Sequence, residues 1–157
     1  MADRIRVKMG EYKVCNSGSV FVTTVGSCIA IGLIDPVAGV GGLAHIMLPE
    51  SNGKNDNVGK YADTAVPAML KEMEKKKAKK ERIVAKIAGG ARMFRFNSNK
   101  MDCIGDRNIE AVRRILKKYG IKIVGEDVGK NHGRTVEFHT SDGKMVIKRA
   151  NRVTNEL

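Results

Sequence analysis

The amino-acid sequence predicts an α/β protein with a mixed β-sheet core. Two pairs of short apolar runs, each pair separated by turn residues, are typical of antiparallel β-hairpins. Between Arg82 and Gly125 an apolar run, an amphipathic stretch and a second apolar run follow one another, which is typical of a βαβ unit with neighbouring parallel strands. Because the chain has 157 residues, we expect one domain over residues 1–157, large enough for a core of its own.

The N-terminal part of the chain predicts two strands. Residues 5–8 alternate between apolar and basic side chains, and residues 19–25 are rich in β-branched side chains. The turn residues Asn16-Ser17-Gly18 precede the second run, and we expect them to join the two strands.

The first hairpin is predicted over residues 26–34 and 41–49, with an intervening Asp-Pro-Val-Ala-Gly segment that reverses the chain. If the turn is centred on residues 36–37, opposed residue numbers sum to 73 and Cys28 lies directly opposite His45, whereas a wider loop gives a sum of 75. Strand side chains alternate with a period of two, so either odd sum places Cys28 and His45 on one face of the sheet.

Two helices and two further strands are predicted in the middle of the chain. The first helix begins near Ala62 and runs towards Lys80. A buried strand over residues 82–88, a helix over residues 106–119 and a strand over residues 121–125 form the βαβ unit.

The last third of the chain predicts a second hairpin. Its strands, residues 135–139 and 144–148, are joined through an Asp142-Gly143 step, which is a strong signal for a tight turn. We expect residues 150–157 to form a frayed tail.

Composition limits the classes of partner. The net charge of +12 suggests nucleic acid, but with four Phe, three Tyr and no Trp the chain has no interleaved aromatic and basic motif that stacks bases. Many of the cations lie in residues 75–80, which fits the solvated C-terminal end of a helix. No run approaches the roughly 18 apolar residues of a membrane span, and we find no signal-peptide pattern. We expect a cytoplasmic protein that neither binds nucleic acid nor inserts into a membrane.

The cysteines and histidines suggest a nucleophile rather than a metal site. Cys15, Cys28 and Cys103 are widely spaced and form no CxxC or Cys/His cluster, which argues against structural zinc and disulfides. Two interpretations of Cys28 stay open: a small buried hydrophobic residue, or a nucleophile activated by an imidazole on the same face.

The other members of such a site are also open to two interpretations. His45 fits either a core histidine or a general base. A triad needs a third group to hold the ring, and the strand entering Cys28 offers Thr23 and Thr24 but no acidic residue.

Several longer motifs occur in a fixed order between about residue 10 and residue 149. They are Gly26-Ser27-Cys28, Gly42-Leu43-Ala44-His45-Ile46-Met47-Leu48-Pro49, Gly59-Lys60-Tyr61-Ala62-Asp63-Thr64-Ala65, Lys86-Ile87-Ala88-Gly89-Gly90-Ala91 with Met93-Phe94, Ile104-Gly105 with Arg107-Asn108, and Gly125-Glu126-Asp127. With these motifs the sequence resembles the chemoreceptor glutamine deamidase family, CheD.

The resemblance implies a single deamidase domain with an α/β sandwich fold, similar to the catalytic domain of cytotoxic necrotizing factor toxins. It implies a protein-glutamine glutaminase, an amidohydrolase that converts glutamine side chains of methyl-accepting chemotaxis receptors to glutamate without a metal or organic cofactor. Carried over by motif, Cys28 is the nucleophile and His45 the general base and acid. Thr23 matches the commoner spacing of the third member better than Thr24 does.

The family resemblance also implies partners. Besides the receptors, members bind the chemotaxis phosphatase CheC. The alternative function is a non-catalytic chemotaxis adaptor that binds the receptor or CheC.

Overall fold

The structure is a computed structural model that describes residues 3–16, 18–93 and 103–157. Ser17 of the expected turn and Phe94 of the quoted motif lie outside the described residues. Within the described ranges, no helix is both long and apolar enough to cross a membrane.

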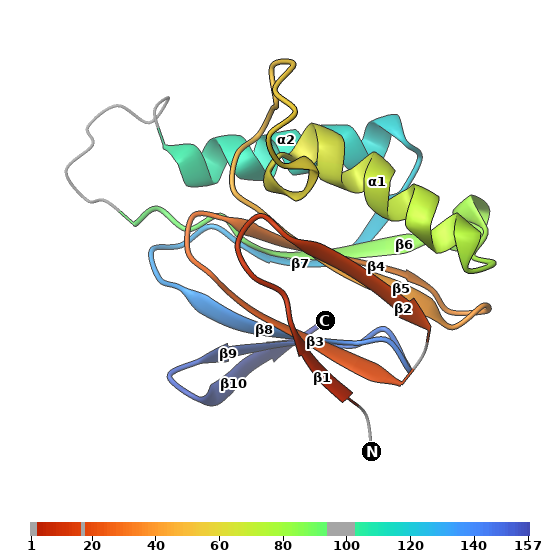
Figure 1. Cartoon of the computed structure of the whole chain (residues 1–157). Coiled ribbons are helices and arrows are strands. Elements are labelled where there is room, and N and C mark those ends of the chain that lie inside the picture. The colour runs from red at the N-terminus through yellow and green to blue at the C-terminus, as the bar shows by residue number, and fades with distance from the viewer. Residues whose placement is uncertain (1–2, 17, 94–102) are drawn as a thin grey trace.

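The described residues form three layers: two β-sheets packed face to face and a layer of helices on the outer face of one sheet (Figure 1). The helix-covered sheet has the strand order β2 (Tyr12–Asn16), β5 (Val40–Ile46), β4 (Ile29–Asp35), β6 (Val84–Gly89) and β7 (Lys122–Val128). The second sheet has the order β1 (Asp3–Arg6), β3 (Ser19–Val25), β8 (Arg134–His139), β9 (Met145–Arg149) and β10 (Arg152–Glu156). The helices are η1 (Val58–Lys60), α1 (Ala62–Lys75), η2 (Lys80–Arg82) and α2 (Ile104–Lys118).

Both sheets are mixed, so the predicted α/β class with a mixed sheet is confirmed. Strands β6 and β7 pair in parallel across α2, as the βαβ pattern predicts, and β8 pairs with β9 as the second hairpin. The two long helices start and end within a few residues of their predicted limits, except that α1 ends at Lys75 rather than near Lys80.

The central strands are covered by a core on each side. One apolar cluster lies between the helices and the first sheet, and a second lies between the two sheets. Every residue of β4 and β5 is buried, because these strands contact the helices on one face and the second sheet on the other. Strands covered on both faces are apolar throughout, which explains why the two runs lack alternation.

The loop of the first hairpin takes the wider form. Opposed residues sum to 75, so His45 pairs with Ala30 and not with Cys28. The reason is Asp35, whose buried carboxylate accepts hydrogen bonds from the backbone N–H groups of Val37 and Ala38 and from Arg82. These bonds build a four-residue connection between paired Asp35 and Val40.

Two expectations about the ends of the chain are wrong. The residues expected to join the first two predicted strands instead follow β2, a strand that we did not predict from the sequence. Strand β1 is the parallel neighbour of β3. The expected frayed tail contains β10, which pairs with β9. Strand β10 is exposed along its whole length and is joined through its backbone, so its side chains show no apolar period.

Candidate active site

Two strands and the bend between β3 and β4 carry the three candidate side chains. Thr23 lies on β3 of the second sheet, and His45 lies on β5 of the first sheet. Cys28 lies in the bend that leads from β3 into β4 and packs against the core between the sheets. Residues from both sheets therefore meet here, with Thr23 and His45 buried and Cys28 half-buried.

Thr23 fixes the tautomer of His45. The Thr23 hydroxyl lies 2.7 Å from His45 Nδ1, and it also donates a 2.7 Å hydrogen bond to the backbone carbonyl of Val7. A hydroxyl has a single proton to donate. Because the Val7 carbonyl takes that proton, Nδ1–H must donate to Thr23, and the lone pair of the neutral ring lies on Nε2.

Burial keeps both members of the candidate pair uncharged at neutral pH. It lowers the pKa of His45 to about 4 and raises the pKa of the Cys28 thiol. The resting state thus has a neutral thiol and a neutral imidazole, and not a thiolate–imidazolium pair.

His45 Nε2 is buried and has no hydrogen-bond partner among the described residues. If the register of β4 and β5 is extended by one residue, Cys28 lies opposite Met47, which places it diagonal to His45 on the same face. Side chains in diagonal positions have their backbones about 7–8 Å apart, within reach of long side chains. The unpartnered nitrogen is therefore on the face of the sheet that carries the thiol.

The bend that carries Cys28 is held in place by hydrogen bonds to three successive carbonyl groups of its own backbone. Ala91 N–H donates to the Gly26 carbonyl and Gly90 N–H to the Cys28 carbonyl, both at 2.9 Å. Between them, Asn108 Nδ2 donates to the Ser27 carbonyl at 3.0 Å. The segment after β6 and helix α2 together fix the backbone at the thiol.

Gly89 allows this close approach. Its φ is +120°, and a Cβ atom there would lie 2.2 Å from the Cys28 carbonyl oxygen. Only glycine fits both the conformation and the space. The chain that approaches Gly89 is the Cys28 bend.

Asn108 is a site residue that pattern reasoning missed. It is fully buried on α2, and its Nδ2 donates to both the Ser27 carbonyl and the Met47 carbonyl, at 3.0 and 3.1 Å. One amide thereby links the bend before Cys28 to the chain just after His45. The available signal was a polar residue beside Ile109 on the apolar stripe of an amphipathic helix.

The remaining candidates lie apart from this arrangement. Thr24 is exposed, and its hydroxyl lies 3.4 Å from that of Thr135. Cys15 contacts the Thr140 hydroxyl at 3.9 Å. Cys103 precedes α2 and is half-buried.

Comparison with known proteins supports the resemblance. Residues 47–149 match the family described as CheD chemotactic sensory transduction. The chain is 50% identical over 144 residues to the chemoreceptor glutamine deamidase CheD of Thermotoga maritima, covering 91% of this chain and 90% of that protein. It is 47% identical over 148 residues to the probable chemoreceptor glutamine deamidase CheD of Archaeoglobus fulgidus, covering 94% of each.

Among solved structures, the Neisseria meningitidis protein NMB0706 of the DUF152 family is similar, with a TM-score of 0.50 and 10% sequence identity over 83% of this chain and 64% of that one. At this identity the likeness concerns the fold alone. The sequence relatives, in contrast, match almost from end to end at close to half identity. With motifs, fold and relatives in agreement, the chain belongs to the CheD family.

Proposed function

We propose that this protein is a chemoreceptor glutamine deamidase that hydrolyses glutamine side-chain amides in methyl-accepting chemotaxis receptors. The names of its relatives support the substrate. The observation that carries the chemistry is the Thr23–His45 hydrogen bond, because it leaves an unpartnered basic Nε2 on the face that holds Cys28. The family match begins at residue 47, so the roles of Cys28, His45 and Thr23 rest on this geometry and on the quoted motifs.

The first half of the proposed reaction forms a thioester. His45 Nε2 takes the Cys28 proton as the sulfur attacks the carboxamide carbon, which forms a C–S bond and a tetrahedral oxyanion. The imidazolium then protonates the amide nitrogen, the C–N bond breaks and ammonia leaves. Because both groups start neutral, the thiolate forms during attack rather than before it.

The second half returns the enzyme to its starting state. The neutral Nε2 takes a proton from water as the oxygen attacks the thioester carbon. The C–S bond breaks, Cys28 regains its proton from His45, and glutamate is released. Hydrogen bonds in free enzymes are often longer than in substrate complexes, and a small movement of the Cys28 bend would close the pair when substrate binds.

The bend also offers donors for the oxyanion. The carbonyls of Gly26, Ser27 and Cys28 are all hydrogen-bonded to neighbouring segments, whereas the N–H groups of Ser27 and Cys28 have no partner within the described part of the chain. Backbone N–H groups held in this way stabilise a tetrahedral intermediate without reorganising. We assign them as the oxyanion donors.

We further propose that the protein acts in the cytoplasm as one deamidase domain and binds the phosphatase CheC. A receptor fragment should carry glutamate in place of glutamine after incubation with the parent protein, as peptide mass spectrometry reports. Cys28→Ala should abolish the conversion, with Cys15→Ala as the matched control that retains it. Full conversion by Cys28→Ala would show that Cys28 is not the nucleophile. A parent protein that converts no receptor glutamine would leave the non-catalytic adaptor as the better description, with CheC and receptor binding as its readout.

A further inference from the structure

A cavity of about 350 Å³ opens against the imidazole of the candidate active site. His45 and Thr23 form part of its wall, together with Arg6 at the end of β1 and Lys8 and Met9 from the segment that connects β1 to β2. A group bound in this cavity would lie directly beside the catalytic ring. The cavity is therefore placed to receive substrate atoms next to the target glutamine.

The cations at this cavity have no role in the fold's ion pairs. Arg6 and Lys8 are exposed, and neither has an ion-pair partner among the residues that the structure describes. Arg4, two residues earlier, is different because it pairs with Glu137 at 2.9 Å. Lys13 on β2 adds a third cation, since its Nζ donates to the Arg6 carbonyl at 3.0 Å.

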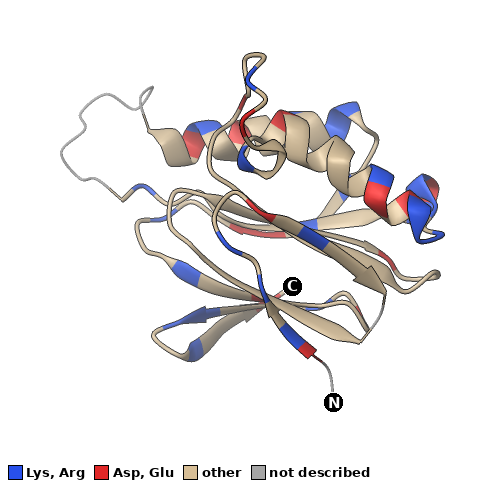
Figure 2. Ribbon diagram, in the orientation of Figure 1, with Lys and Arg blue, Asp and Glu red and all other residues tan. Residues whose placement is uncertain are grey.

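The carboxylate on the connecting segment does not neutralise these cations. Glu11 Oε1 accepts a 2.8 Å hydrogen bond from the Lys8 backbone N–H and so shapes the turn. Figure 2 shows basic positions on β1, on the following segment and on β2, all at this edge of the sandwich. Three cations against one carboxylate leave a local positive field where substrate would enter.

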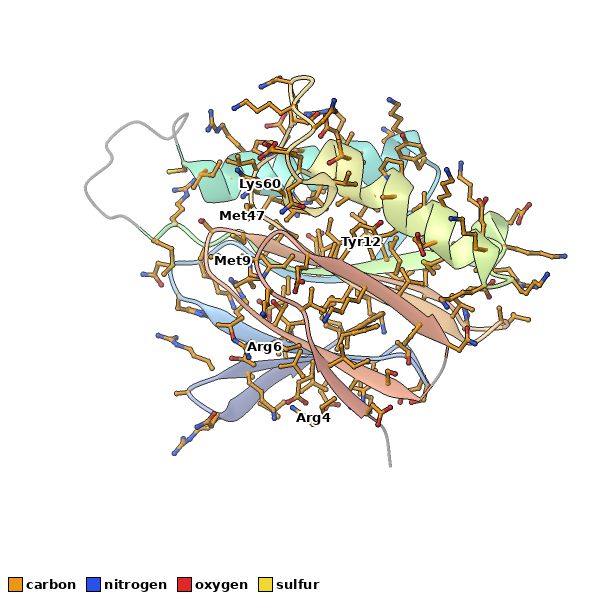
Figure 3. The ribbon with its side chains drawn as sticks, viewed as in Figure 1. Arg4, Arg6, Met9, Tyr12, Met47 and Lys60 are labelled. Carbon is orange, nitrogen blue, oxygen red and sulfur yellow. The ribbon has the colours of Figure 1, made fainter. Side chains whose placement is uncertain are left out.

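The same segment presents an apolar contact. Met9 is 63% exposed, and Figure 3 labels it on the segment that follows β1, beyond Arg6. Its side chain is flexible and polarizable, so it can pack against side chains of different shape. The cavity thus combines an apolar rim with unpaired positive charge.

We propose that this cavity is a substrate-selection site, in which Arg6 and Lys8 bind a carboxylate close in sequence to the target glutamine. The inference rests on the proposed deamidase function and goes beyond it by naming the substrate class: glutamines with acidic neighbours. An acidic neighbour complements the two cations, and a basic neighbour is repelled by them.

The test uses two short peptides that each contain one glutamine, flanked by glutamates in one and by lysines in the other. The readout is the ratio of kcat/KM for the two peptides, measured by ammonia release. Two exposed charge pairs give the parent protein a preference of roughly tenfold or more for the acidic peptide at low salt. Higher ionic strength should narrow the preference.

Charge reversal in Arg6→Glu/Lys8→Glu should invert the preference, so that the basic peptide becomes the better substrate. The matched control is Lys122→Glu/Arg152→Glu, which makes the same change in net charge on exposed residues of β7 and β10, the edge strands opposite β2 and β1 in their sheets. This control should keep the parent's ratio. An equal ratio in the parent and the Arg6/Lys8 variant, or an equal loss in the control, would overturn the proposal.

If the charge-reversed protein does not fold, the neutral variant Arg6→Gln/Lys8→Gln tests the same proposal. Its ratio should approach one, and retention of the parent's ratio would also overturn the proposal.

Cys28→Ala separates this inference from the proposed function. If Cys28→Ala deamidates either peptide, Cys28 is not the nucleophile, and if the parent protein deamidates neither peptide nor a receptor fragment, the deamidase function fails. An active parent and an inactive Cys28→Ala, combined with unchanged ratios in the Arg6/Lys8 variants, mean that only the selection site fails.

Discussion

The Thr23 hydroxyl lies 2.7 Å from His45 Nδ1 and joins a strand of one sheet to a strand of the other. The same hydroxyl donates to the Val7 carbonyl, so the imidazole is the donor in the Thr23–His45 bond. This one contact decides both the orientation of the ring and which nitrogen carries the lone pair. A threonine can do this because the ring needs only an acceptor at Nδ1, although it stabilises imidazolium less than a carboxylate would.

Removing the Thr23 hydroxyl should impair both activity and stability. In Thr23→Val, Nδ1–H and the Val7 carbonyl lose a buried partner, which costs about 1–3 kcal/mol in the free energy of unfolding. The ring is also free to take the wrong tautomer, so kcat should fall at least tenfold, as general acid–base catalysis contributes roughly 10²–10⁴-fold. Urea unfolding and deamidation kinetics measure the two effects.

Thr24→Val is the matched control for that experiment. Thr24 is the next residue on β3, but it is exposed and contacts Thr135. Its substitution should change the free energy of unfolding by less than about 0.5 kcal/mol, as is usual for surface positions. A larger loss of kcat in Thr24→Val than in Thr23→Val would contradict the assigned role.

The low pKa of His45 predicts how stability depends on pH. The pKa of about 4 lies below the ordinary value of 6.5, so between these pH values the unfolded chain binds a proton that the folded chain does not. His45 therefore costs stability as pH falls from 6.5 towards 4. The difference in unfolding free energy between the parent and His45→Gln should shrink over this window, and a difference that is constant with pH would argue against a neutral buried ring.

The neutral resting pair predicts the reactivity of Cys28. Burial raises the pKa of this thiol above its ordinary value, so its alkylation by iodoacetamide should increase steadily through neutral pH and into the alkaline range. A Cys15→Ala/Cys103→Ala background isolates the signal. A plateau in the alkylation rate between pH 5 and 8 would instead indicate a preformed thiolate–imidazolium pair.

Asn108 should act by positioning Cys28 and His45, because its side chain is hydrogen-bonded to the backbone close to each of them. Asn108→Asp replaces its N–H donor with an anion near 3 Å from the carbonyls of Ser27 and Met47. We expect the loss of unfolding free energy in Asn108→Asp to exceed that in Asn108→Ala, since burying an unpaired charge costs more than leaving two carbonyls unpaired.

The activity of the Asn108 variants provides a second readout. If Asn108 sets the separation of thiol and imidazole, kcat should fall more than KM rises in both variants. Should both variants keep the parent's kcat once folded, Asn108 would be a structural residue alone.

Gly89 tests how tightly the Cys28 bend is enclosed. In Gly89→Ala a methyl group would meet the Cys28 carbonyl at 2.2 Å, which forces the bend to move. Gly120→Ala is the control, because Gly120 also has a positive φ, of +72°, but its Cβ would meet no atom within 4 Å among the described residues. Deamidation should fall in Gly89→Ala and persist in Gly120→Ala, whereas equal losses would point to backbone strain alone.

Much of the fold follows from the sequence because local patterns record local structure. The stripe of α2 and the apolar runs of β4, β5 and β6 each show whether one or both faces are covered. Because side chains alternate between the two faces of a strand, the sequence spacing was also enough to predict that Cys28 and His45 lie on one face of the sheet. Strands β2 and β10 escaped prediction because their side chains show no alternation in burial: those of β2 are mostly half-buried and those of β10 are all exposed, and backbone pairing forms both strands.

The sequence by itself determined the class of fold, the family and the identity of the candidate nucleophile and base, since these depend on residue type and spacing. Only the tertiary structure decided which threonine contacts His45, that the loop at Asp35 shifts the register, and that Asn108 joins the two segments of the site. The physical reason is that these contacts link separate strands and a helix. Sequence spacing constrains neighbours along one element, but contacts between elements depend on how their faces pack.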